Sequence, residues 1–533
     1  MRIRHLVVRL LCLALAVVAA SPWAAAQQRG GVLQVAHRDS PASMSPLEEV
    51  TISATAPMMA VFNNLVLFDQ HVPQNTLGSI VPDLADSWAW SADGKQLTFR
   101  LRRGVRWHDG RNFTAHDVAC TWNLLLGKFA AKFRINPRKS WYWNLDAVTV
   151  NGDDEAVFHL KQRQPAFLAL LASGWSPVYP CHVPPQDMRQ HPVGTGPFKF
   201  VSYKPNEAIR LERNPDYWKP GLPYLEGIEW TIIANRATSL LAFVTGKLDM
   251  TFPYEVTVPV LKDIRGQAPD AICELRPRGV ASTLIVNRAA APFDNPELRR
   301  AMALALDRKS FIDVLSEGQA NIGAAMLPGP EGVWGMPPDR LAKLPGYDPD
   351  VSKSRSEARR IMQRLGYGPD KPLAVKVATR NIPLYRDPAV MLLDQLKEIY
   401  FAAELDIVET ANWNPKVTRR DYMVGLENTA TAVVDDPDQN LYENYSCDSD
   451  RNFTGYCNRA LEERFHRQSA ETDQEQRKKL VWGIDAELQE EGARPVIFHT
   501  RGATCWHPRV KGVSTMVNSM YNGWRLDDVW LEK

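Results

Sequence analysis

The sequence predicts an α/β fold, and three observations carry that prediction. Segments with the alternation typical of strands stand between segments whose apolar residues recur at helical spacing, most clearly over residues 356–408. Asp-Gly turns at residues 93–94 and 109–110 separate short strand patterns. The chain has 533 residues, which is enough for about two to four domains. We therefore expect mixed sheets covered by helices, in more than one domain.

Residues 1–26 have the features of a signal peptide. Three arginines lie among the first nine residues, an apolar run spans residues 10–20, and three alanines stand at residues 24–26. The run is too short to cross a bilayer comfortably, and a retained anchor is the alternative. Cys12 lies inside the run, which argues against a lipoprotein cleavage site. We expect removal of the signal peptide and a mature chain that starts near Gln27.

The composition argues against nucleic-acid binding and against further membrane segments. The chain has 63 Lys and Arg against 61 Asp and Glu, without a basic stripe or an acidic tail. No segment after the signal peptide reaches about 18 uninterrupted apolar residues, so we expect no other membrane crossing.

Six cysteines follow the predicted signal peptide, at positions 120, 181, 273, 447, 457 and 505. An even number in an oxidising compartment suggests disulfides, although the connectivity stays open from the residues alone. Cys447 and Cys457 flank a short polar loop, and we expect this pair first. Cys120–Cys181 and Cys273–Cys505 are the remaining expected pairs, with buried free thiols as the alternative.

Strand and helix patterns alternate through the first half of the chain. A strand over 31–36 leads into a loop over 37–46, and residues 54–69 place apolar side chains on one helical face. The turn at 93–94 joins two strands, and Thr114 is a candidate N-cap for a helix that starts near Ala115. A turn at 194–197, a strand over 228–233 and a helix over 237–246 follow.

The second half continues the alternation. A buried strand over 283–287 precedes a helix with Asn295 as N-cap and Pro296 at its first position. Residues 326–350 are rich in Pro and Gly and predict a loop. Helices are expected over 356–365 and 389–403, and strands over 375–377, 405–408 and 495–498.

The sequence lacks the common catalytic motifs. It contains no Gly-x-Ser-x-Gly, no His-Glu-x-x-His, no Cys-x-x-Cys and no phosphate-binding loop. The His108-Asp109 pair and the Cys181-His182 cluster with His191 are better explained as structural features than as sites. We expect neither an enzyme nor a bound metal or cofactor.

Three stretches resemble one protein family. Residues 193–218 read VGTGPFKFVSYKPNEAIRLERNPDYW, residues 292–308 read PFDNPELRRAMALALDR, and residues 81–118 contain VPDLADSW and LTFRLRRGVRWHDGRNFTAHDV. They closely resemble the extracytoplasmic solute-binding proteins of family 5, which serve peptide-type ATP-binding-cassette importers. The resemblance also supports the Cys447–Cys457 loop, because dipeptide-binding relatives have a similar one.

The resemblance implies the two-lobed fold of large type II periplasmic binding proteins, with an extra inserted subdomain. Lobe I would comprise residues 27–278, with the insertion at about 70–192, and residues 500–533. Lobe II would comprise residues 279–499, with crossovers near 276–282 and 496–503.

The resemblance also implies a function. The chain would be the periplasmic component of an importer that captures a peptide or peptide-like solute between its lobes and delivers it to the membrane permease. Separate subunits would hydrolyse ATP, and the binding protein would be a monomer without nucleic-acid partners. A non-peptide solute, such as an oligosaccharide, an opine or a metal chelate, is the alternative.

Expected ligand contacts follow from the same resemblance, which places the specificity region at residues 411–445. Trp413 matches a pocket-side Trp, and Val433 occupies the position where peptide binders have an Asp for the ligand amine. Asp435 or Asp436 could take that role, with turn capping as the alternative. Arg419, with Arg420, could clamp a carboxylate, or form a solvated face. The loop over 37–46 should line the cleft from lobe I. The expected ligand-binding residues are Asp39, Ser40, Met44, Trp413, Arg419, Asp435 and Asp436.

Overall fold

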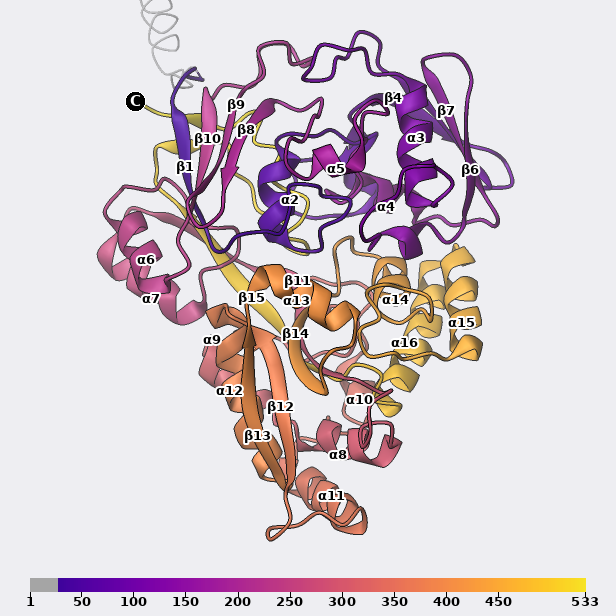
Figure 1. Ribbon diagram of the computed structural model, residues 1–533, viewed down its shortest axis with the longest axis vertical. Helices are drawn as coiled ribbons and strands as arrows, with labels where there is room; N and C mark the ends of the chain where they lie inside the picture. The colour runs from indigo at the N-terminus through magenta and orange to yellow at the C-terminus, as the bar shows by residue number, and fades with distance from the viewer. Residues whose placement is uncertain (1–26) are drawn as a thin grey trace, which may run out of the picture.

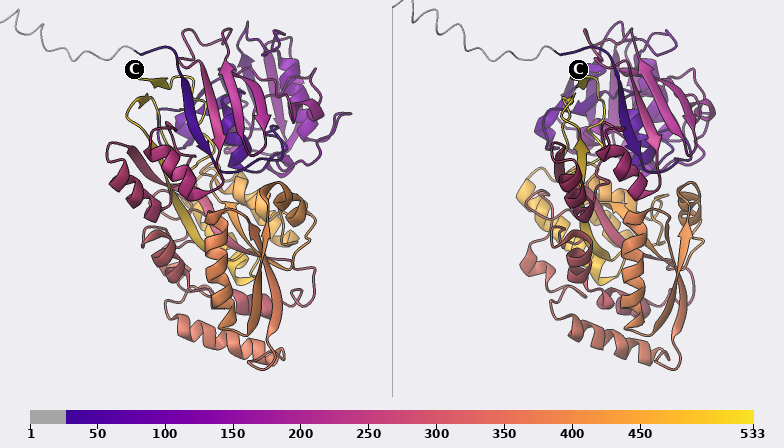
Figure 2. Two further views of the ribbon diagram at one scale, coloured as in Figure 1. Left: turned by 60° about the vertical axis from the view of Figure 1, so that its left-hand side comes forward. Right: turned by 90° about the vertical axis from the view of Figure 1, so that its left-hand side faces the viewer.

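The computed structural model describes residues 27–533, which form two lobes (Figure 1). The predicted signal peptide lies outside the described residues. We call residues 27–271 with 507–533 the upper lobe and residues 287–495 the lower lobe, as they stand in Figure 1. Two long strands, β11 (Ile272–Val286) and β15 (Val496–Trp506), pass between them. Figure 2 shows the lobes stacked along the longest axis from two further sides.

Two four-stranded sheets build the upper lobe. The first has the order β1-β10-β9-β8, in which β1 pairs with β10 in parallel and the other neighbours are antiparallel. The second has the order β4-β5-β7-β6 and is antiparallel throughout. The strands of this lobe are β1 (Val32–His37), β2 (Val66–Phe68), β3 (Ile80–Pro82), β4 (Ala85–Trp90), β5 (Gln96–Leu101), β6 (Leu145–Val150), β7 (Glu155–Leu160), β8 (Phe198–Lys204), β9 (Ala208–Arg213), β10 (Gly227–Ile232), β16 (Val510–Lys511) and β17 (Trp530–Leu531).

One five-stranded sheet forms the centre of the lower lobe, with the order β13-β12-β14-β11-β15. β12 (Leu373–Arg380) runs parallel to β13 (Phe401–Val408) and to β14 (Val424–Ala430), whereas β11 is antiparallel to β14 and β15. Because β11 and β15 belong to this sheet and also reach the upper lobe, they form the covalent connection between the lobes (Figure 1).

Helices cover the sheets of both lobes (Figures 1 and 2). In the upper lobe they are α2 (Ile52–Met59), α3 (Ala115–Leu125), α4 (Phe167–Ala172), α5 (Pro185–Met188), α6 (Arg236–Val244), α7 (Val258–Gln267) and the 3-10 turns η2 (Leu77–Ser79) and η3 (Lys139–Tyr142). In the lower lobe they are α8 (Pro296–Ala305), α9 (Arg308–Ser316), α10 (Pro338–Leu341), α11 (Val351–Arg364), α12 (Pro383–Lys397), α13 (Thr410–Thr418), α14 (Pro437–Asn444), α15 (Arg459–Ala470) and α16 (Gln474–Glu490). Within the described residues, no helix combines the length and the apolar character that a membrane span needs.

The cysteines pair as expected. Cys120–Cys181, Cys273–Cys505 and Cys447–Cys457 are all joined in the described structure. Cys273 and Cys505 lie opposite each other in the ladder between β11 and β15. The second of these disulfides therefore ties together the two strands that connect the lobes.

Several local predictions are confirmed. The strands before and after the 93–94 turn pair as β4 and β5, and Gly94 has a φ of +68°, which suits a glycine in a tight turn. Thr114 and Asp117 form a reciprocal capping box at the start of α3. Asn295 caps α8 by accepting a hydrogen bond from the Glu297 N–H.

Two predicted helices are wrong in extent. Residues 54–69 do not form one helix, because α2 ends at Met59 and residues 66–68 pair as β2 with β3. The helix expected over 389–403 ends at Lys397, since Phe401 already begins β13. The loop over 326–350 contains the short helix α10. The predicted lobe boundaries stay a prediction, and both predicted crossovers fall on β11 and β15.

Candidate functional site

A cavity lies between the lobes beside β11, and we call it the central cavity. The space between its lining atoms, part of which is open to solvent, is about 390 Å³. The upper lobe and β11 supply Arg38, Val50, Thr51, Ile52, Arg278, Val280, Met520 and Tyr521, and the lower lobe supplies Arg380, Tyr385, Asn414, Glu427, Asn428 and Arg451. The part of this space that the centre of a water molecule can occupy is only about 20 Å³, room for about one water molecule. A solute would therefore need the lobes to move apart.

Strand ends and one disulfide loop position the charged lining residues. Arg38 follows the last residue of β1, and Arg380 is the last residue of β12. Glu427 and Asn428 lie within β14. Arg451 belongs to the loop that the Cys447–Cys457 disulfide closes, so this bond holds a cavity residue in place. Ligand sites at the carboxyl ends of parallel strands are common in α/β proteins.

Asp39 joins the two lobes just behind this cavity. Its carboxylate accepts hydrogen bonds from Arg380 Nη2 at 2.8 Å and from Thr410 Oγ1 at 2.7 Å, both in the lower lobe. It also accepts a hydrogen bond from the Ser53 hydroxyl in its own lobe. Burial alone would raise the pKa of Asp39, but the guanidinium groups of Arg38 and Arg380 lower it to about 2. Asp39 is therefore a buried anion shared by both lobes.

Arg278 on β11 has no comparable partner. Its side chain is 1% exposed, and its Nε and Nη1 have no hydrogen-bond partner among the described residues. The nearby carboxylate of Glu255 lies 3.9 Å from Nη2, beyond hydrogen-bond reach. Glu255 instead accepts a hydrogen bond of 3.0 Å from Arg38 Nη1. Burial lowers the pKa of Arg278, but a guanidinium group stays charged in proteins.

The lower-lobe wall holds a second charged group. Arg451 Nε donates to Glu443 Oε1 at 3.0 Å, and both side chains are buried. Burial raises the pKa of Glu427, although Arg380, Arg451 and Arg494 act in the opposite direction. Glu427 is therefore more readily protonated than a carboxyl group exposed to solvent.

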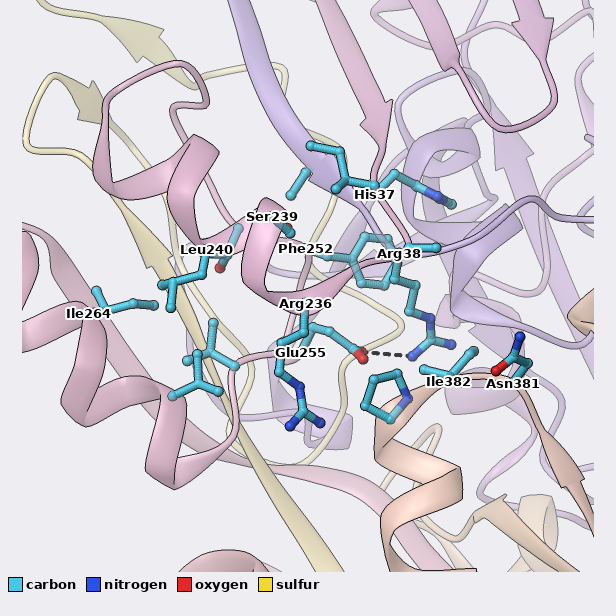
Figure 3. Close-up of a pocket in the computed structure, with 17 residues that line it drawn as sticks. His37, Arg38, Arg236, Ser239, Leu240, Phe252, Glu255, Ile264, Asn381 and Ile382 are labelled. Atoms are coloured by element: carbon cyan, nitrogen blue, oxygen red, sulfur yellow. Dashed lines mark hydrogen bonds and ion pairs between the residues drawn. The ribbon is translucent and has the colours of Figure 1, made fainter. Parts of the chain in front are cut away.

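Two further cavities, which we call side cavities, also have lining residues from both lobes. The first has about 670 Å³ of empty space and also contacts Arg38 (Figure 3). Figure 3 shows Arg38 and Glu255 joined by a hydrogen bond between His37 and Phe252 of the upper lobe and Asn381 and Ile382 of the lower lobe. The second has about 1,050 Å³ and lies among residues 74–78, Trp334, Arg477 and the Asp435-Asp436 pair.

The predicted residues of the 37–46 loop have different surroundings. Asp39 belongs to the ion pairs described above. Ser40 donates a hydrogen bond of 3.0 Å to Asn206 Oδ1 at the surface of the upper lobe, and Met44 is fully buried in the upper core. Neither Ser40 nor Met44 lines the three cavities described here. Their role in ligand binding stays a prediction.

The predicted residues of the specificity region are also spread out. Trp413 is fully buried in an apolar cluster with Ile285 and Phe453, and its indole lies beside Glu427. Arg419 is exposed at the end of α13. Asp435 and Asp436 both line the second side cavity, where burial raises the pKa of Asp435 to about 7.

Asp436 has a structural role in this arrangement. Its side chain caps α14 through the Asp438 N–H and forms two hydrogen bonds with Arg477, of 2.7 and 2.8 Å. Turn capping, the alternative named from the sequence, therefore accounts for its position. Val433 is buried in the upper core.

Sequence reasoning missed most of the central cavity. It did not single out Arg278, Arg380, Arg451, Glu427 or Asn428. One signal was present: Glu427 and Asn428 are polar residues in the middle of an otherwise small or apolar strand, Val424–Ala430. Buried polar residues at such positions need partners, and this is the pattern of a site. Among residues 27–533, no group of three or more His, Cys, Asp or Glu residues is arranged to hold a metal ion.

Comparisons with known proteins agree with this architecture. Residues 79–452 match the model of bacterial extracellular solute-binding proteins, family 5. Di/tripeptide-binding protein 1 of Pseudomonas aeruginosa is 25% identical over 531 residues, which covers 93% of each chain.

Two solved structures show the same fold. One is the periplasmic binding protein DppA of Helicobacter pylori in complex with the peptide STSA, with a TM-score of 0.82, 22% identity, and coverage of 95% of this chain and 99% of that one. The other is OppA of Haemophilus influenzae in complex with RPPGFSPFR, with a TM-score of 0.82, 21% identity and the same coverage. The chain belongs to family 5 of the bacterial extracellular solute-binding proteins.

Proposed function

We propose that this chain is the periplasmic binding component of an ATP-binding-cassette importer and that it holds a peptide or peptide-like solute in the central cavity. Membership of a solute-binding family supports the general role. The di- and tripeptide-binding relative and the peptide-bound structures of the same fold support the peptide class. The observation on this chain that carries the proposal is the convergence of polar side chains from both lobes on the space beside β11, which would widen as the lobes open.

Asn428 illustrates why a peptide suits this cavity. The residue is 7% exposed, and neither its amide nitrogen nor its amide oxygen has a hydrogen-bond partner among the described residues. Leaving such groups unpaired in a buried site costs about 1–3 kcal/mol each. A peptide group offers one donor and one acceptor, which is the complement of a carboxamide.

The two connecting strands suit binding by lobe closure. A solute that contacts both lobes binds the closed form better and shifts the population toward it. The permease of the importer would then recognise the closed form, and separate subunits would hydrolyse ATP. On this proposal the chain acts as a monomer and makes or breaks no covalent bond.

The proposal is tested by a binding screen. The protein is unfolded and refolded to remove carried-over solute, and its melting temperature is measured with di- to pentapeptides, opines, sugars and nickel chelates. We expect peptides to raise the melting temperature and the other classes to leave it unchanged. Stabilisation by another class alone would replace the peptide assignment, and a folded protein that no solute stabilises would contradict the function.

A matched pair of variants locates the site. Asn428→Ala should weaken binding of a stabilising peptide about 10-fold, because it removes hydrogen bonds to the solute. Asn412→Ala changes an exposed asparagine on α13 and should leave the affinity unchanged. If Asn428→Ala and Asn412→Ala both bind the peptide as tightly as wild type does, the central cavity is excluded as the binding site.

A further inference from the structure

Arg278 is a buried cation whose hydrogen-bonding capacity the described residues leave unused. Its Nε and Nη1 have no partner, and Glu255 is 3.9 Å from Nη2. The side chain is 1% exposed, so bulk water does not replace the missing partners. A buried charge without hydrogen bonds is strongly unfavourable unless another group pairs with it. Arg308 provides a contrast, because its equally buried guanidinium donates to the Val496 carbonyl at 2.8 Å and to the Gly346 carbonyl.

The nearest carboxylates are taken by the other two arginines. Within 4 Å, the guanidinium groups of Arg38, Arg278 and Arg380 contact two carboxylates, those of Asp39 and Glu255. Asp39 already accepts hydrogen bonds from Arg380, Thr410 and Ser53. Glu255 accepts its hydrogen bond from Arg38. Arg278 is therefore the guanidinium of these three to which no described residue makes a hydrogen bond.

The backbone holds Arg278 firmly against the cavity. The next residue, Gly279, has a φ of +64°, and its carbonyl accepts hydrogen bonds from the Thr431 and Ala432 N–H groups at 2.9 and 3.0 Å. A Cβ at residue 279 would lie 2.5 Å from the Ala432 carbonyl oxygen, so β11 and the segment after β14 are in close contact here. These contacts fix the backbone from which the Arg278 side chain extends, and its guanidinium can bind a planar oxyanion through two parallel hydrogen bonds.

We propose that Arg278 binds an oxyanion of the solute, a carboxylate, inside the central cavity. The proposal rests on the proposed function and restricts the class of solute: it would be a peptide or peptide-like molecule with a carboxylate at a fixed position. Asn428, which lines the same cavity with unpartnered amide atoms, would bind neutral polar atoms of the same solute. The carboxylate can be the C-terminus of a peptide or an acidic side chain.

The test compares Arg278→Met with wild type in two ways. The first measures the solute-free melting temperature, with Arg308→Met as the matched control. We expect Arg278→Met to be as stable as wild type or more stable, because it removes an unpaired buried charge. Arg308→Met should be clearly less stable, because it leaves two carbonyl groups without their donor. A loss of stability in Arg278→Met as large as that in Arg308→Met would assign Arg278 a structural role and overturn the proposal.

The second measurement is binding by calorimetry and by thermal shift. The probes are trialanine, trialanine amide and the amide of Ala-Glu-Ala, together with acetate and inorganic phosphate against chloride at equal ionic strength. If the bound carboxylate is the C-terminus of the peptide, wild type should bind trialanine but not trialanine amide. If the bound carboxylate is an acidic side chain, wild type should bind the amide of Ala-Glu-Ala. Arg278→Met should bind the preferred peptide about 100-fold more weakly and lose any stabilisation by acetate or phosphate.

The outcomes separate this proposal from the function itself. If wild type binds trialanine and its amide equally and Arg278→Met binds them equally well, peptide binding stands and the role of Arg278 is refuted. If no peptide binds but acetate or phosphate stabilises only the protein with Arg278, the oxyanion site stands and the peptide assignment fails. If none of the probes binds wild type, the oxyanion proposal is overturned.

Discussion

Replacing Asp39 with Asn should favour opening of the lobes, because Asp39 forms a buried ion pair between them. The Asp39 carboxylate contacts Arg380 and Thr410 across the interface at 2.8 and 2.7 Å. In an open form these two contacts would be broken, whereas those to Arg38 and Ser53, in the same lobe, would remain.

The size of the effect follows from the pKa of Asp39. Its value falls from the ordinary 3.8 to about 2, a difference worth about 2.4 kcal/mol at 1.36 kcal/mol per unit. Arg38 accounts for part of this lowering of the pKa, and its contact with Asp39 stays in place when the lobes open, because both residues belong to the upper lobe. We therefore expect Asp39→Asn to shift the equilibrium toward the open form by about 1.4 kcal/mol, which is about 10-fold. The solute affinity should weaken by a similar factor.

Small-angle scattering of the solute-free protein and calorimetry with a stabilising peptide measure the two effects. We expect Asp39→Asn to have a larger radius of gyration than wild type and weaker binding. Asp69→Asn is the control, because Asp69 accepts its hydrogen bond from the His71 backbone within the upper lobe. An unchanged scattering profile and an unchanged affinity in Asp39→Asn would refute the reasoning.

The same pair has a defined pH dependence. The pKa of Asp39 is lower in the folded protein than in the unfolded chain. Its stabilising contribution is therefore complete above about pH 4 and is lost as the pH falls toward 2. Unfolding of wild type should depend on pH in this window more steeply than unfolding of Asp39→Asn.

Three further predictions concern stability. Serine at both cysteines of the 447–457 loop should lower the free energy of unfolding by about 2–3 kcal/mol in urea titrations, and wild-type stability would contradict a stabilising bond. Burial lowers the pKa of His499 to about 4. Because the unfolded chain protonates this histidine first, the free energy of unfolding should fall by about 3 kcal/mol as the pH drops from 6.5 to 4. His499→Gln should reduce this pH dependence of the free energy of unfolding. Gly194→Ala would place a Cβ 1.9 Å from the Val61 carbonyl oxygen and should destabilise the fold by about 1–3 kcal/mol, whereas Gly266→Ala, with nothing within 4 Å, should be tolerated; equal melting temperatures would show that the 194 contact relaxes.

Local signals in the sequence predicted most elements, and the errors have a common cause. Capping residues such as Thr114 and Asn295 act through their immediate neighbours and were identified correctly. The sequence predicts a helix that includes residues 66–68, because their apolar pattern is compatible with one. They form β2 instead because they pair with β3, a contact that spacing alone does not reveal. Similarly, the expected helix over 389–403 ends before Tyr400, whose φ of +71° breaks the helix.

The candidate site was harder to predict because its residues are distant in the sequence. Arg38, Arg278 and Arg380 each lie at the end of a strand or on a connecting strand, and only the fold brings them together. Resemblance pointed to residues 411–445, and that range does contain Glu427 and Asn428. It could not show that Arg278 lacks a partner, because this depends on which carboxylates the other arginines occupy.

The disulfide between the two connecting strands limits how the lobes can move. Cys273 and Cys505 fix β11 against β15 near the upper lobe, and the ladder between these strands changes register between Pro277 and Ala281. Sliding of one strand along the other would have to break this disulfide, so we expect lobe motion to be a rotation about the irregular stretch. Arg278 lies within that stretch, next to the pivot. A solute bound to Arg278 would lie close to the rotation axis. A small displacement there would therefore correspond to a larger displacement at the end of the lower lobe that is farthest from β11.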